Sequence, residues 1–316
     1  MVTPKDFIER KRCIVCKSSD NFTWTKTSYR HYLSIRQDIS SNPDVFSSIP
    51  KISDKIIKLK RCSNCGFVFA SPQIKPISLS KIYNREASYF ESYSDTKSLA
   101  HLKRQSTFDL EVAKINSLSA GGNILDVGCN GGYFLNKLGD IWKKTGVEID
   151  PDAAKSAEKL LRGKAKIINS ELEKANLKEN FFDCVVIRGT IEHVPDPERT
   201  LKTIFKLLKP NGIVAINTQN IDSFAAKLYR QNFRLLDPIH HIWNFSPSTI
   251  SLLCHNIGFN IEKVNFNYFN TPYFRIIDLI TVLTDWITFW LFSVRPNRVS
   301  PPFYGNIMDI YARKPV

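Results

Sequence analysis

The sequence predicts an α/β fold built on a doubly wound, mainly parallel sheet. Three observations lead to this prediction. Residues 123–133 place a short apolar run before a glycine-rich turn, after which a helical pattern begins. Residues 144–150 form a second short strand pattern that ends in carboxylates, and residues 181–217 alternate strand, helix, turn and strand. Strands that alternate with helices in this way are typical of a parallel sheet covered by helices.

The segment 123–133 reads Asn-Ile-Leu-Asp-Val-Gly-Cys-Asn-Gly-Gly-Tyr, and we expect the rest of the chain to be organised around it. Glycines let the backbone adopt positive φ angles and approach a ligand closely, and the free N–H groups at a helix start favour an electron-rich partner. We therefore predict a cofactor site at Gly128, Gly131 and Gly132. A tight turn that binds nothing is the alternative.

The second strand supplies an acidic side chain at a suitable distance from this loop. Glu148 follows Gly128 by twenty residues, the spacing at which a carboxylate can accept two hydrogen bonds from a ribose. The loop also begins with an acid, Asp126, and lacks the Gly-x-Gly-x-x-Gly spacing of dinucleotide-binding proteins. These features point away from a nicotinamide cofactor.

Residues 126–132 resemble the first motif of the class I S-adenosylmethionine-dependent methyltransferases, Asp/Glu-x-Gly-x-Gly-x-Gly. Asn130 stands where that family usually has its middle glycine, and asparagine tolerates a left-handed backbone better than other non-glycine residues. The resemblance continues through 181–188, similar to the fourth strand, 191–197, similar to the loop after it, and 207–217, similar to the turn and fifth strand.

This resemblance implies a Rossmann-like, seven-stranded sheet and an enzyme that uses S-adenosylmethionine. Ile167 and Ile168 would belong to the third strand, and Glu171 falls where the family often has an acid near adenine, although a solvated loop carboxylate is the alternative. The residues predicted to bind the cofactor are Asp126, Gly128, Asn130, Gly132, Glu148, Glu171 and Arg188.

Four of the seven cysteines form two Cys-x-x-Cys pairs, Cys13/Cys16 and Cys62/Cys65. Each pair can give two thiolates to one tetrahedral zinc ion, and in a reducing cytoplasm this pattern favours zinc over disulfides. Structural or redox-active thiol pairs are the alternative. The 45 residues between the pairs predict an excursion, with a loop around Ser40 to Pro50. We expect Cys129, Cys184 and Cys254 to be small buried hydrophobic residues.

The second pair lies in a segment, residues 61–72 followed by Tyr83, Tyr89 and Phe90, that resembles the zinc-binding leader of bacterial methyltransferases of sugar and surface-glycan biosynthesis. The sugar C-methyltransferases of that group carry a long additional C-terminal domain, which we do not expect here. The predicted organisation is a zinc-binding leader over residues 1–95 and a methyltransferase domain over residues 96–316, with an apolar helical insertion at about 273–300.

The remaining elements follow from local patterns. Apolar spacing predicts a covering helix over 98–119. A helix capped by Asp196 and started by Pro197 should end at the turn 209–212, and a strand over 213–216 should follow. A further helix should run from Ser246 to Gly258. Strands are expected at 259–266 and 306–313, and in the resembling family these last two pair antiparallel.

Residues 273–294 are the least expected part of the chain. As a helix they would have a wide apolar face and one narrow polar stripe, formed by Arg275, Asp278, Thr281, Asp285 and Thr288. Acidic residues at the centre of a membrane-spanning helix are costly, so we do not expect a span. The alternatives are a core helix or dimer contact, a helix on a membrane surface with its aromatic residues at headgroup level, and an active-site lid.

Composition sets outer bounds. The 316 residues can bury a full core, and the formal net charge of +14 favours anionic partners such as nucleotide-sugars, lipid phosphates or nucleic acid. No basic run exceeds the triplet 10–12 and no nucleic-acid motif accompanies it, so nucleic acid is the less favoured partner. Residues 1–10 contain no secretory apolar core. We expect a cytoplasmic protein, with attachment to the inner face of the membrane through 273–294 as an alternative.

Two histidine sites are candidates for contacting the acceptor or removing its proton. His193 follows Glu192 at the carboxyl end of the predicted fourth strand, where open sheets present ligands. His240 and His241 lie in 238–246, a segment that resembles the acceptor-side loop of the family. We predict catalytic roles for His193 and His241 and give His240 less weight. The alternative for each is a structural hydrogen bond that fixes a loop.

These observations together predict transfer of a methyl group from S-adenosylmethionine to an oxygen of a sugar, nucleotide-sugar or lipid-linked glycan. The resemblance of the leader carries the choice of acceptor, which is an inference by analogy. An RNA methyltransferase and a quinone or lipid O-methyltransferase are alternatives among enzymes. A non-catalytic scaffold on a methyltransferase fold is the alternative from another class.

Overall fold

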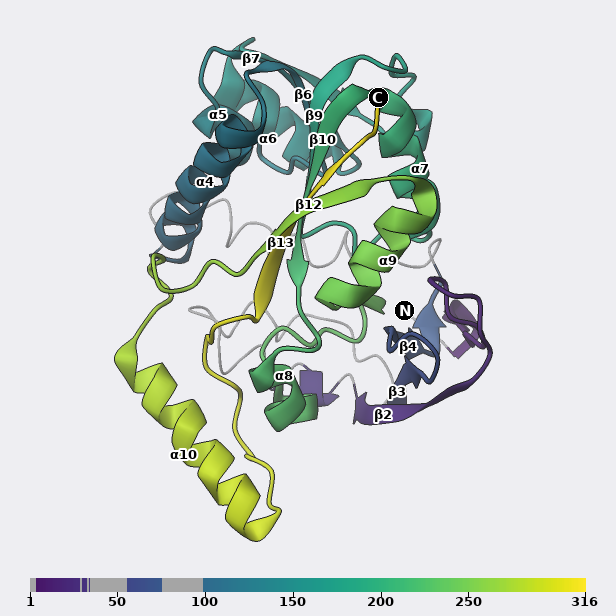
Figure 1. Cartoon of the computed structure of the whole chain (residues 1–316), viewed down its shortest axis with the longest axis vertical. Helices are drawn as coiled ribbons and strands as arrows, with labels where there is room; N and C mark the ends of the chain where they lie inside the picture. Colours follow the sequence, from purple (N-terminus) through teal and green to yellow (C-terminus); the bar gives the residue numbers. More distant parts are fainter. Residues whose placement is uncertain (1–3, 29, 33, 35–55, 76–98) are drawn as a thin grey trace. The chain divides into compact units, whose positions relative to one another are not determined.

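The computed structural model describes residues 4–28, 30–32, 34, 56–75 and 99–316 (Figure 1). The predicted loop around Ser40 to Pro50 and the leader residues Tyr83, Tyr89 and Phe90 lie outside the described residues.

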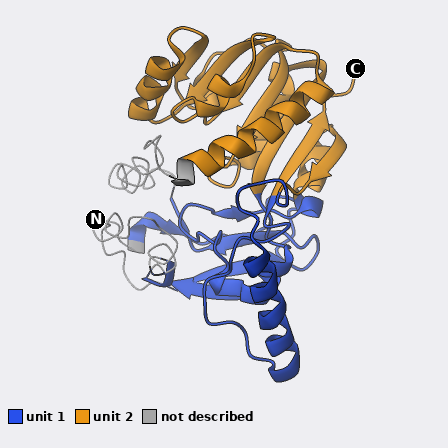
Figure 2. Cartoon of the chain, turned by 90° about the vertical axis from the view of Figure 1, so that its left-hand side faces the viewer, with its two compact units in different colours: residues 1–98, 219–249, 268–307 blue, residues 99–218, 250–267, 308–316 orange. Residues whose placement is uncertain are grey.

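The chain divides into two compact units (Figure 2). Unit 1 comprises Met1–Ser98, Gln219–Thr249 and Tyr268–Ile307. Unit 2 comprises Leu99–Thr218, Ile250–Asn267 and Met308–Val316. The predicted leader, residues 1–95, therefore lies in unit 1 together with two later segments of the chain.

A seven-stranded sheet forms the centre of unit 2, with the strand order β12-β13-β10-β9-β6-β7-β8. The pairs β10–β9, β9–β6, β6–β7 and β7–β8 are parallel, and β12 pairs antiparallel with β13. This confirms the predicted fold class and the antiparallel pairing of the last two strands. The strands are β6 (Gly122–Val127), β7 (Trp142–Glu148), β8 (Ala165–Asn169), β9 (Phe182–Arg188), β10 (Leu208–Gln219), β12 (Asn260–Asn265) and β13 (Ile307–Arg313).

Two helices, α6 and α7, begin where the sequence places an aspartate followed by a proline. The Asp150 side chain accepts hydrogen bonds from the backbone of Asp152 and Ala153 at the start of α6, and the Asp196 side chain accepts from Arg199 N at the start of α7. Both helices also begin with proline, whose fixed φ suits the first helical position. The helices are α4 (Leu99–Leu118), α5 (Tyr133–Lys137), α6 (Pro151–Leu161), α7 (Pro197–Leu207) and α9 (Pro247–Ile257), with a short 3-10 turn, η3 (Leu172–Lys174).

One boundary differs from the prediction. Strand β10 begins at Leu208, directly after α7, so residues 209–212 are part of the strand and not a separate turn. The predicted turn corresponds to an irregular part of this strand. The register of β10 against β9 shifts between Leu208 and Ile213, and Asn211 has a φ of 65°. Cys129, Cys184 and Cys254 are buried, as predicted.

Unit 1 contains a four-stranded sheet of order β11-β4-β3-β2 and a two-stranded sheet, β1-β5. Its core combines residues of the leader, such as Ile57 and Leu59, with residues of the later segments, such as Tyr229, Phe233 and Val282. Its elements are η1 (Pro4–Asp6), β1 (Phe7–Ile8), β2 (Asn21–Ser28), β3 (Ile56–Cys62), β4 (Val68–Ser71), β5 (Gln73–Ile74), α8 (Phe224–Tyr229), η4 (Arg230–Asn232), β11 (Trp243–Asn244) and α10 (Ile276–Phe292).

Helix α10 confirms the predicted helix within 273–294 and is the long helix of unit 1 in Figure 2. Among the helices in the described part of the chain, none combines the length and hydropathy that crossing a bilayer requires.

Candidate functional site

The glycine loop follows β6 in unit 2, as the sequence predicts. Gly128, Asn130 and Gly132 have φ angles of 73°, 49° and 76°, so the asparagine adopts the left-handed conformation expected of a glycine at its position. A Cβ at Gly128 would lie 2.5 Å from Thr190 Oγ1, which leaves room for glycine alone. The amides of Gly128 and Cys129 both donate to Val147 O, at 2.8 and 3.1 Å, and so hold the loop against the end of β7.

Glu148, the last residue of β7, lies directly against this loop. Its Oε2 accepts a hydrogen bond from Asn130 N at 2.8 Å and its Oε1 accepts one from Asp150 N at 2.9 Å. Burial raises the pKa of Glu148, and these backbone hydrogen bonds oppose the shift. The structure thus brings together the loop and the acid that the sequence pairs by spacing. Binding of a ribose by Glu148 stays a prediction.

Asp126 is buried in the middle of the sheet, where β6 pairs with both β7 and β9. Burial raises the pKa of Asp126 to about 7, and the guanidinium of Arg188 opposes this shift. A carboxyl group in this state gains its charge when a second cation approaches. The α-ammonium group of an amino-acid ligand would supply such a cation.

Arg188, at the end of β9, has a side chain that is 9% exposed and paired with Glu111 of α4. Its Nη2 donates to Glu111 Oε1 at 2.7 Å and its Nε donates to Glu111 Oε2. The guanidinium also lies 4.2 and 4.8 Å from the ring centres of Phe108 and Phe134. Although burial opposes it, the Glu111 carboxylate raises the pKa of Arg188. The sequence predicts that Arg188 binds the cofactor. In the structure, its Nε and Nη2 already donate hydrogen bonds to Glu111.

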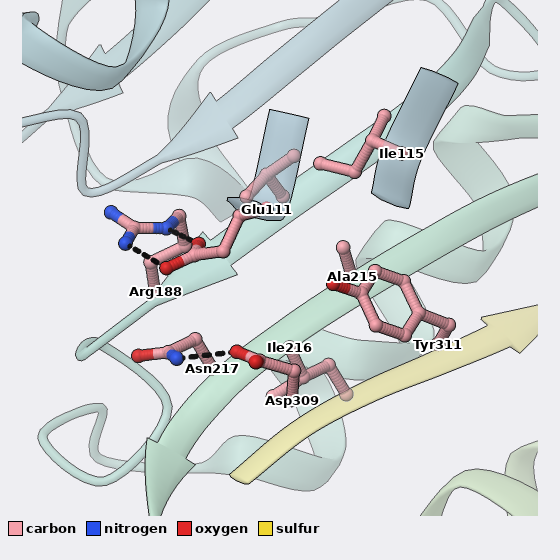
Figure 3. A pocket seen from close by; sticks show the side chains of 9 residues that line it. Glu111, Ile115, Arg188, Ala215, Ile216, Asn217, Asp309 and Tyr311 are labelled. Atoms are coloured by element: carbon pink, nitrogen blue, oxygen red, sulfur yellow. Dashed lines mark hydrogen bonds and ion pairs between the residues drawn. The ribbon is translucent and has the colours of Figure 1, made fainter. Parts of the chain in front are cut away.

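Arg188 and Glu111 line a small pocket together with residues of the neighbouring strands β10 and β13 (Figure 3). There Asp309 of β13 accepts hydrogen bonds from Asn217 Nδ2 at 2.5 Å and Asn267 Nδ2 at 2.6 Å. Burial, with a contribution from Glu111, raises the pKa of Asp309 to about 7. Sequence reasoning missed this polar cluster, because its members are far apart in the chain. The one local signal in β13 is a single acid, Asp309, among the apolar residues Ile307, Met308 and Ile310.

Glu171, the predicted adenine ligand, follows β8 and is exposed. Its carboxylate accepts a hydrogen bond from Lys174 Nζ at 2.9 Å, within a single turn of the chain. The structure places it at the same edge of the sheet as Glu148, since Glu148 ends β7 and Glu171 follows the end of the neighbouring parallel strand β8.

His193 lies in the loop after β9, half-buried, and its backbone N–H donates to Thr190 O at 2.9 Å. Because Thr190 packs against Gly128, this loop and the glycine loop are neighbours. The preceding residue, Glu192, is buried, and burial raises its pKa to about 7. In the sequence, Glu192 stands out only as the neighbour of His193, and its burial is visible only in the structure.

His240 and His241 belong to unit 1. His241 is half-buried, with its Nδ1 3.1 Å from Leu235 O. His240 is buried, and its Nδ1 lies 2.8 Å from Asp237 Oδ2, which also accepts a hydrogen bond from the Tyr32 hydroxyl at 2.8 Å. His240, the histidine given less weight, thus has Asp237 as an acid partner, and the sequence analysis did not identify Tyr32 and Asp237. The structure describes His193 and His241 in different units and does not test their predicted roles.

The four predicted metal ligands, Cys13, Cys16, Cys62 and Cys65, converge in unit 1. Their Sγ atoms all lie within 4.8 Å of one another, with Cys13–Cys65 and Cys16–Cys62 both at 3.5 Å. Four thiolates at about 2.3 Å from a tetrahedral zinc ion would have a similar mutual spacing. Each knuckle closes on a backbone hydrogen bond, Lys17 N to Cys13 O and Gly66 N to Cys62 O, both 3.0 Å.

The thiols of this cluster differ in acidity. Burial raises the pKa of Cys13 to about 11. Burial also acts on Cys16, but hydrogen bonds from the backbone of Ser18 and the side chain of Asn64 outweigh it and lower the pKa to about 7. The donor set and its spacing fit a structural zinc site.

Residues 100–264 match the protein family described as a methyltransferase domain, which is more than half of the chain. The chain belongs to this methyltransferase family. It is an S-adenosylmethionine-dependent methyltransferase with the Rossmann-like fold that the sequence predicts.

Curated relatives and a solved structure extend this comparison. The chain is 28% identical over 167 residues to a ubiquinone biosynthesis O-methyltransferase of Xanthomonas axonopodis, covering 49% of this chain and 70% of the relative. It is 32% identical over 156 residues to the enzyme of that name from Nitrosospira multiformis, covering 46% and 65%. A chain of the complex between the Haloferax volcanii Trm112 methyltransferase activator and a methyltransferase shares the fold, with a TM-score of 0.50 at 12% identity over 72% of this chain and 98% of that one.

Proposed function

We propose that this methyltransferase transfers the methyl group of S-adenosylmethionine to a hydroxyl oxygen of its acceptor. The observation that carries the proposal is the comparison with curated relatives, because those at 28% and 32% identity are both named O-methyltransferases. The matched stretch covers about half of this chain, so the activity of the whole protein is part of the proposal.

The residues around the glycine loop would hold the cofactor. Bound S-adenosylmethionine supplies an electrophilic methyl group on a positively charged sulfur. Glu148 would accept hydrogen bonds from ribose hydroxyls, and Asp126 would gain its charge beside the α-ammonium group. The backbone at Gly128 to Gly132 comes close enough to a ligand because glycine or asparagine occupies each left-handed position.

His193 is the proposed proton acceptor in unit 2, since its loop packs beside the glycine loop through Thr190. Positioning of the acceptor can lower the barrier by about 7 to 11 kcal/mol, whereas a general base contributes a rate factor of roughly 10² to 10⁴. A methyl transfer that loses its base is therefore slowed and not abolished. His241 remains the second proposed base.

We assign the cluster of Cys13, Cys16, Cys62 and Cys65 to a structural zinc ion. Four cysteines complete a tetrahedral shell and leave no position for water or substrate. Zinc here would stabilise the fold of the leader, because the four-thiolate site exists only in the folded chain and the free energy of metal binding therefore adds to that of folding.

For the acceptor, the leader supports a sugar, nucleotide-sugar or lipid-linked glycan, since its four-cysteine cluster resembles that of surface-glycan methyltransferases. The second candidate is a quinone-type lipid, supported by the names of the curated relatives. Both are hydroxyl acceptors, and the two candidates differ in the group that carries the hydroxyl.

One experiment separates them. Purified protein is incubated with S-adenosylmethionine that carries a deuterated methyl group, in parallel with glycan acceptors and with polyprenylated hydroxybenzenes, and products are identified by mass spectrometry. Deuterated methyl ethers in the glycan set support the first candidate, and those in the phenol set support the second. The Glu148→Ala variant is the control and should form less of either product when S-adenosylmethionine is limiting. A methyl product on nitrogen or carbon would contradict O-methylation.

A further inference from the structure

Helix α10 turns an uncharged apolar face to solvent. Six side chains recur at helical spacing along this face and are between 42% and 71% exposed. We call this set the α10 apolar face; it consists of Ile276, Ile280, Leu283, Ile287, Trp290 and Leu291. Single exposed hydrophobic residues are ordinary on soluble proteins, but a contiguous apolar stripe on one helix marks a contact surface.

The opposite side of α10 is already occupied by unit 1 itself. Val282 is 1% exposed and belongs to the core of this unit, and Phe289 packs against that core. Asp278 is also buried on this side. The polar stripe predicted from the sequence thus contributes to the inner side, which packs on the core of unit 1, whereas the apolar face is exposed in the described chain. Because one side of α10 packs on unit 1, the helix can lie on a surface with its other side but cannot be embedded in that surface.

Ion pairs explain why the polar stripe can lie inward. Arg275 Nη2 lies 2.6 Å from Asp278 Oδ1, with the arginine side chain 61% exposed and the aspartate 3%. Arg298 Nη2 lies 2.6 Å from Asp285 Oδ1, with exposures of 54% and 15%. In both pairs the carboxylate is therefore turned inward and the guanidinium outward. Both arginine side chains therefore remain more than half exposed and accessible to an anion.

Unit 1 as a whole carries a net positive charge, the same sign as Arg275 and Arg298. The segments of unit 1 contain 23 lysines and arginines against 13 aspartates and glutamates, whereas those of unit 2 contain 21 against 17. Most of the net charge of +14 therefore belongs to the unit that carries α10. Two copies of unit 1 carry net charge of the same sign and repel each other, so this charge disfavours a homodimer through the α10 apolar face.

We propose that the α10 apolar face binds an anionic lipid bilayer, with the helix lying in the plane of the surface. The isoleucine and leucine side chains would enter the acyl boundary, Trp290 would lie at headgroup level, and Arg275 and Arg298 would face lipid phosphates. At 17 residues the helix is about 26 Å long, enough to seat the whole face on one leaflet. The inference does not depend on which acceptor is methylated.

Vesicle flotation of the full chain tests this without any acceptor. Vesicles of phosphatidylcholine alone are compared with vesicles containing about one third phosphatidylglycerol. The test variant is Leu283→Ser/Trp290→Ser, whose side chains are exposed, so that no cavity forms in the core. The matched control, Leu102→Ser/Ile141→Ser, removes two apolar side chains of unit 2 that are 55% and 53% exposed.

We expect wild type and control to float with the anionic vesicles, less so at about 0.5 M than at about 0.1 M salt, and the test variant to bind at least about tenfold more weakly. Absence of wild-type flotation at low salt would overturn the proposal, as would equal flotation of wild type and test variant. Analytical ultracentrifugation tests whether a second copy of the chain binds the α10 apolar face instead. A wild-type dimer that becomes monomeric in the test variant, without vesicle binding, would assign the face to a second copy.

Discussion

Glu111 and Arg188 form a largely buried ion pair that joins helix α4 to the end of strand β9. Both side chains are less than 10% exposed, and the guanidinium donates two hydrogen bonds to the carboxylate. The pair lies beside Asp126, whose carboxyl group feels the guanidinium charge. Glu111, which lies outside every sequence motif, thus opposes the effect of Arg188 on Asp126, because its carboxylate raises the pKa that the guanidinium lowers.

Removal of Glu111 should therefore destabilise unit 2 strongly. Glu111→Ala leaves the Arg188 guanidinium without its partner, and breaking a buried pair in this way costs about 3–5 kcal/mol. Urea unfolding followed by circular dichroism measures the loss. Asp109→Ala is the control, because its partnership with Lys137 is exposed and should contribute no more than about 0.5 kcal/mol. Equal effects of the two substitutions would contradict the prediction.

Glu148 should contribute to cofactor affinity. Glu148→Ala removes the predicted acceptor of the ribose hydrogen bonds, and hydrogen bonds to a charged group contribute about 1.5–3 kcal/mol each. We expect S-adenosylhomocysteine to bind at least about tenfold more weakly in calorimetric titration. The zinc content of the same sample should not change. Wild-type affinity in this variant would remove Glu148 from the site.

Asp126 should make the stability of the cofactor-free protein depend on pH. Its pKa of about 7 in the folded chain lies above the usual value of 3.8, so the folded state holds the proton over the interval between them and unfolding releases it. The stability contributed by this group therefore falls as the pH rises toward 7. Asp126→Asn removes this dependence.

Urea unfolding of wild type and Asp126→Asn at about pH 5 and about pH 8 measures the effect. The free energy of unfolding of the variant should rise relative to wild type by about 2–3 kcal/mol between these two pH values. The comparison cancels the contributions of other titrating groups, including Glu192 and Asp309. A difference between the two proteins that stays constant with pH would show that Asp126 titrates normally.

The cysteine cluster should hold one zinc ion per chain. Cys62→Ser/Cys65→Ser removes two of four ligands, so the purified protein should lose the metal in elemental analysis and its leader should become sensitive to protease. Cys254→Ala, which changes a buried cysteine outside the cluster, is the control. A wild-type protein that is fully folded without metal would count against the site.

The two predicted bases should affect turnover and not binding. His193→Ala and His241→Ala should each retain S-adenosylhomocysteine affinity, and loss of the true base should lower kcat by roughly 10² to 10⁴. Single-turnover rates with the acceptor identified above provide the measurement. If both variants react at the wild-type rate, the two histidines are structural.

Sequence patterns were sufficient wherever the cause of a structure is local. The glycine loop, the cap at Asp196 and the spacing between Gly128 and Glu148 depend on the allowed backbone angles of a few neighbouring residues. The order of these motifs also predicted the parallel sheet and the family. The two Cys-x-x-Cys pairs predicted the cluster, because two such knuckles can present four thiols to a single point.

Contacts between distant segments could be seen only in the tertiary structure. The pairing of Glu111 with Arg188 and of Asn217 with Asp309 joins residues 77 and 92 positions apart, and no local pattern encodes such a distance. Helix α10 shows the same limit, since its amphipathic pattern predicts two different faces and does not say which one meets the protein. The ion pairs of Asp278 and Asp285 decide this: they satisfy the acids on the inner side and leave the apolar face to solvent.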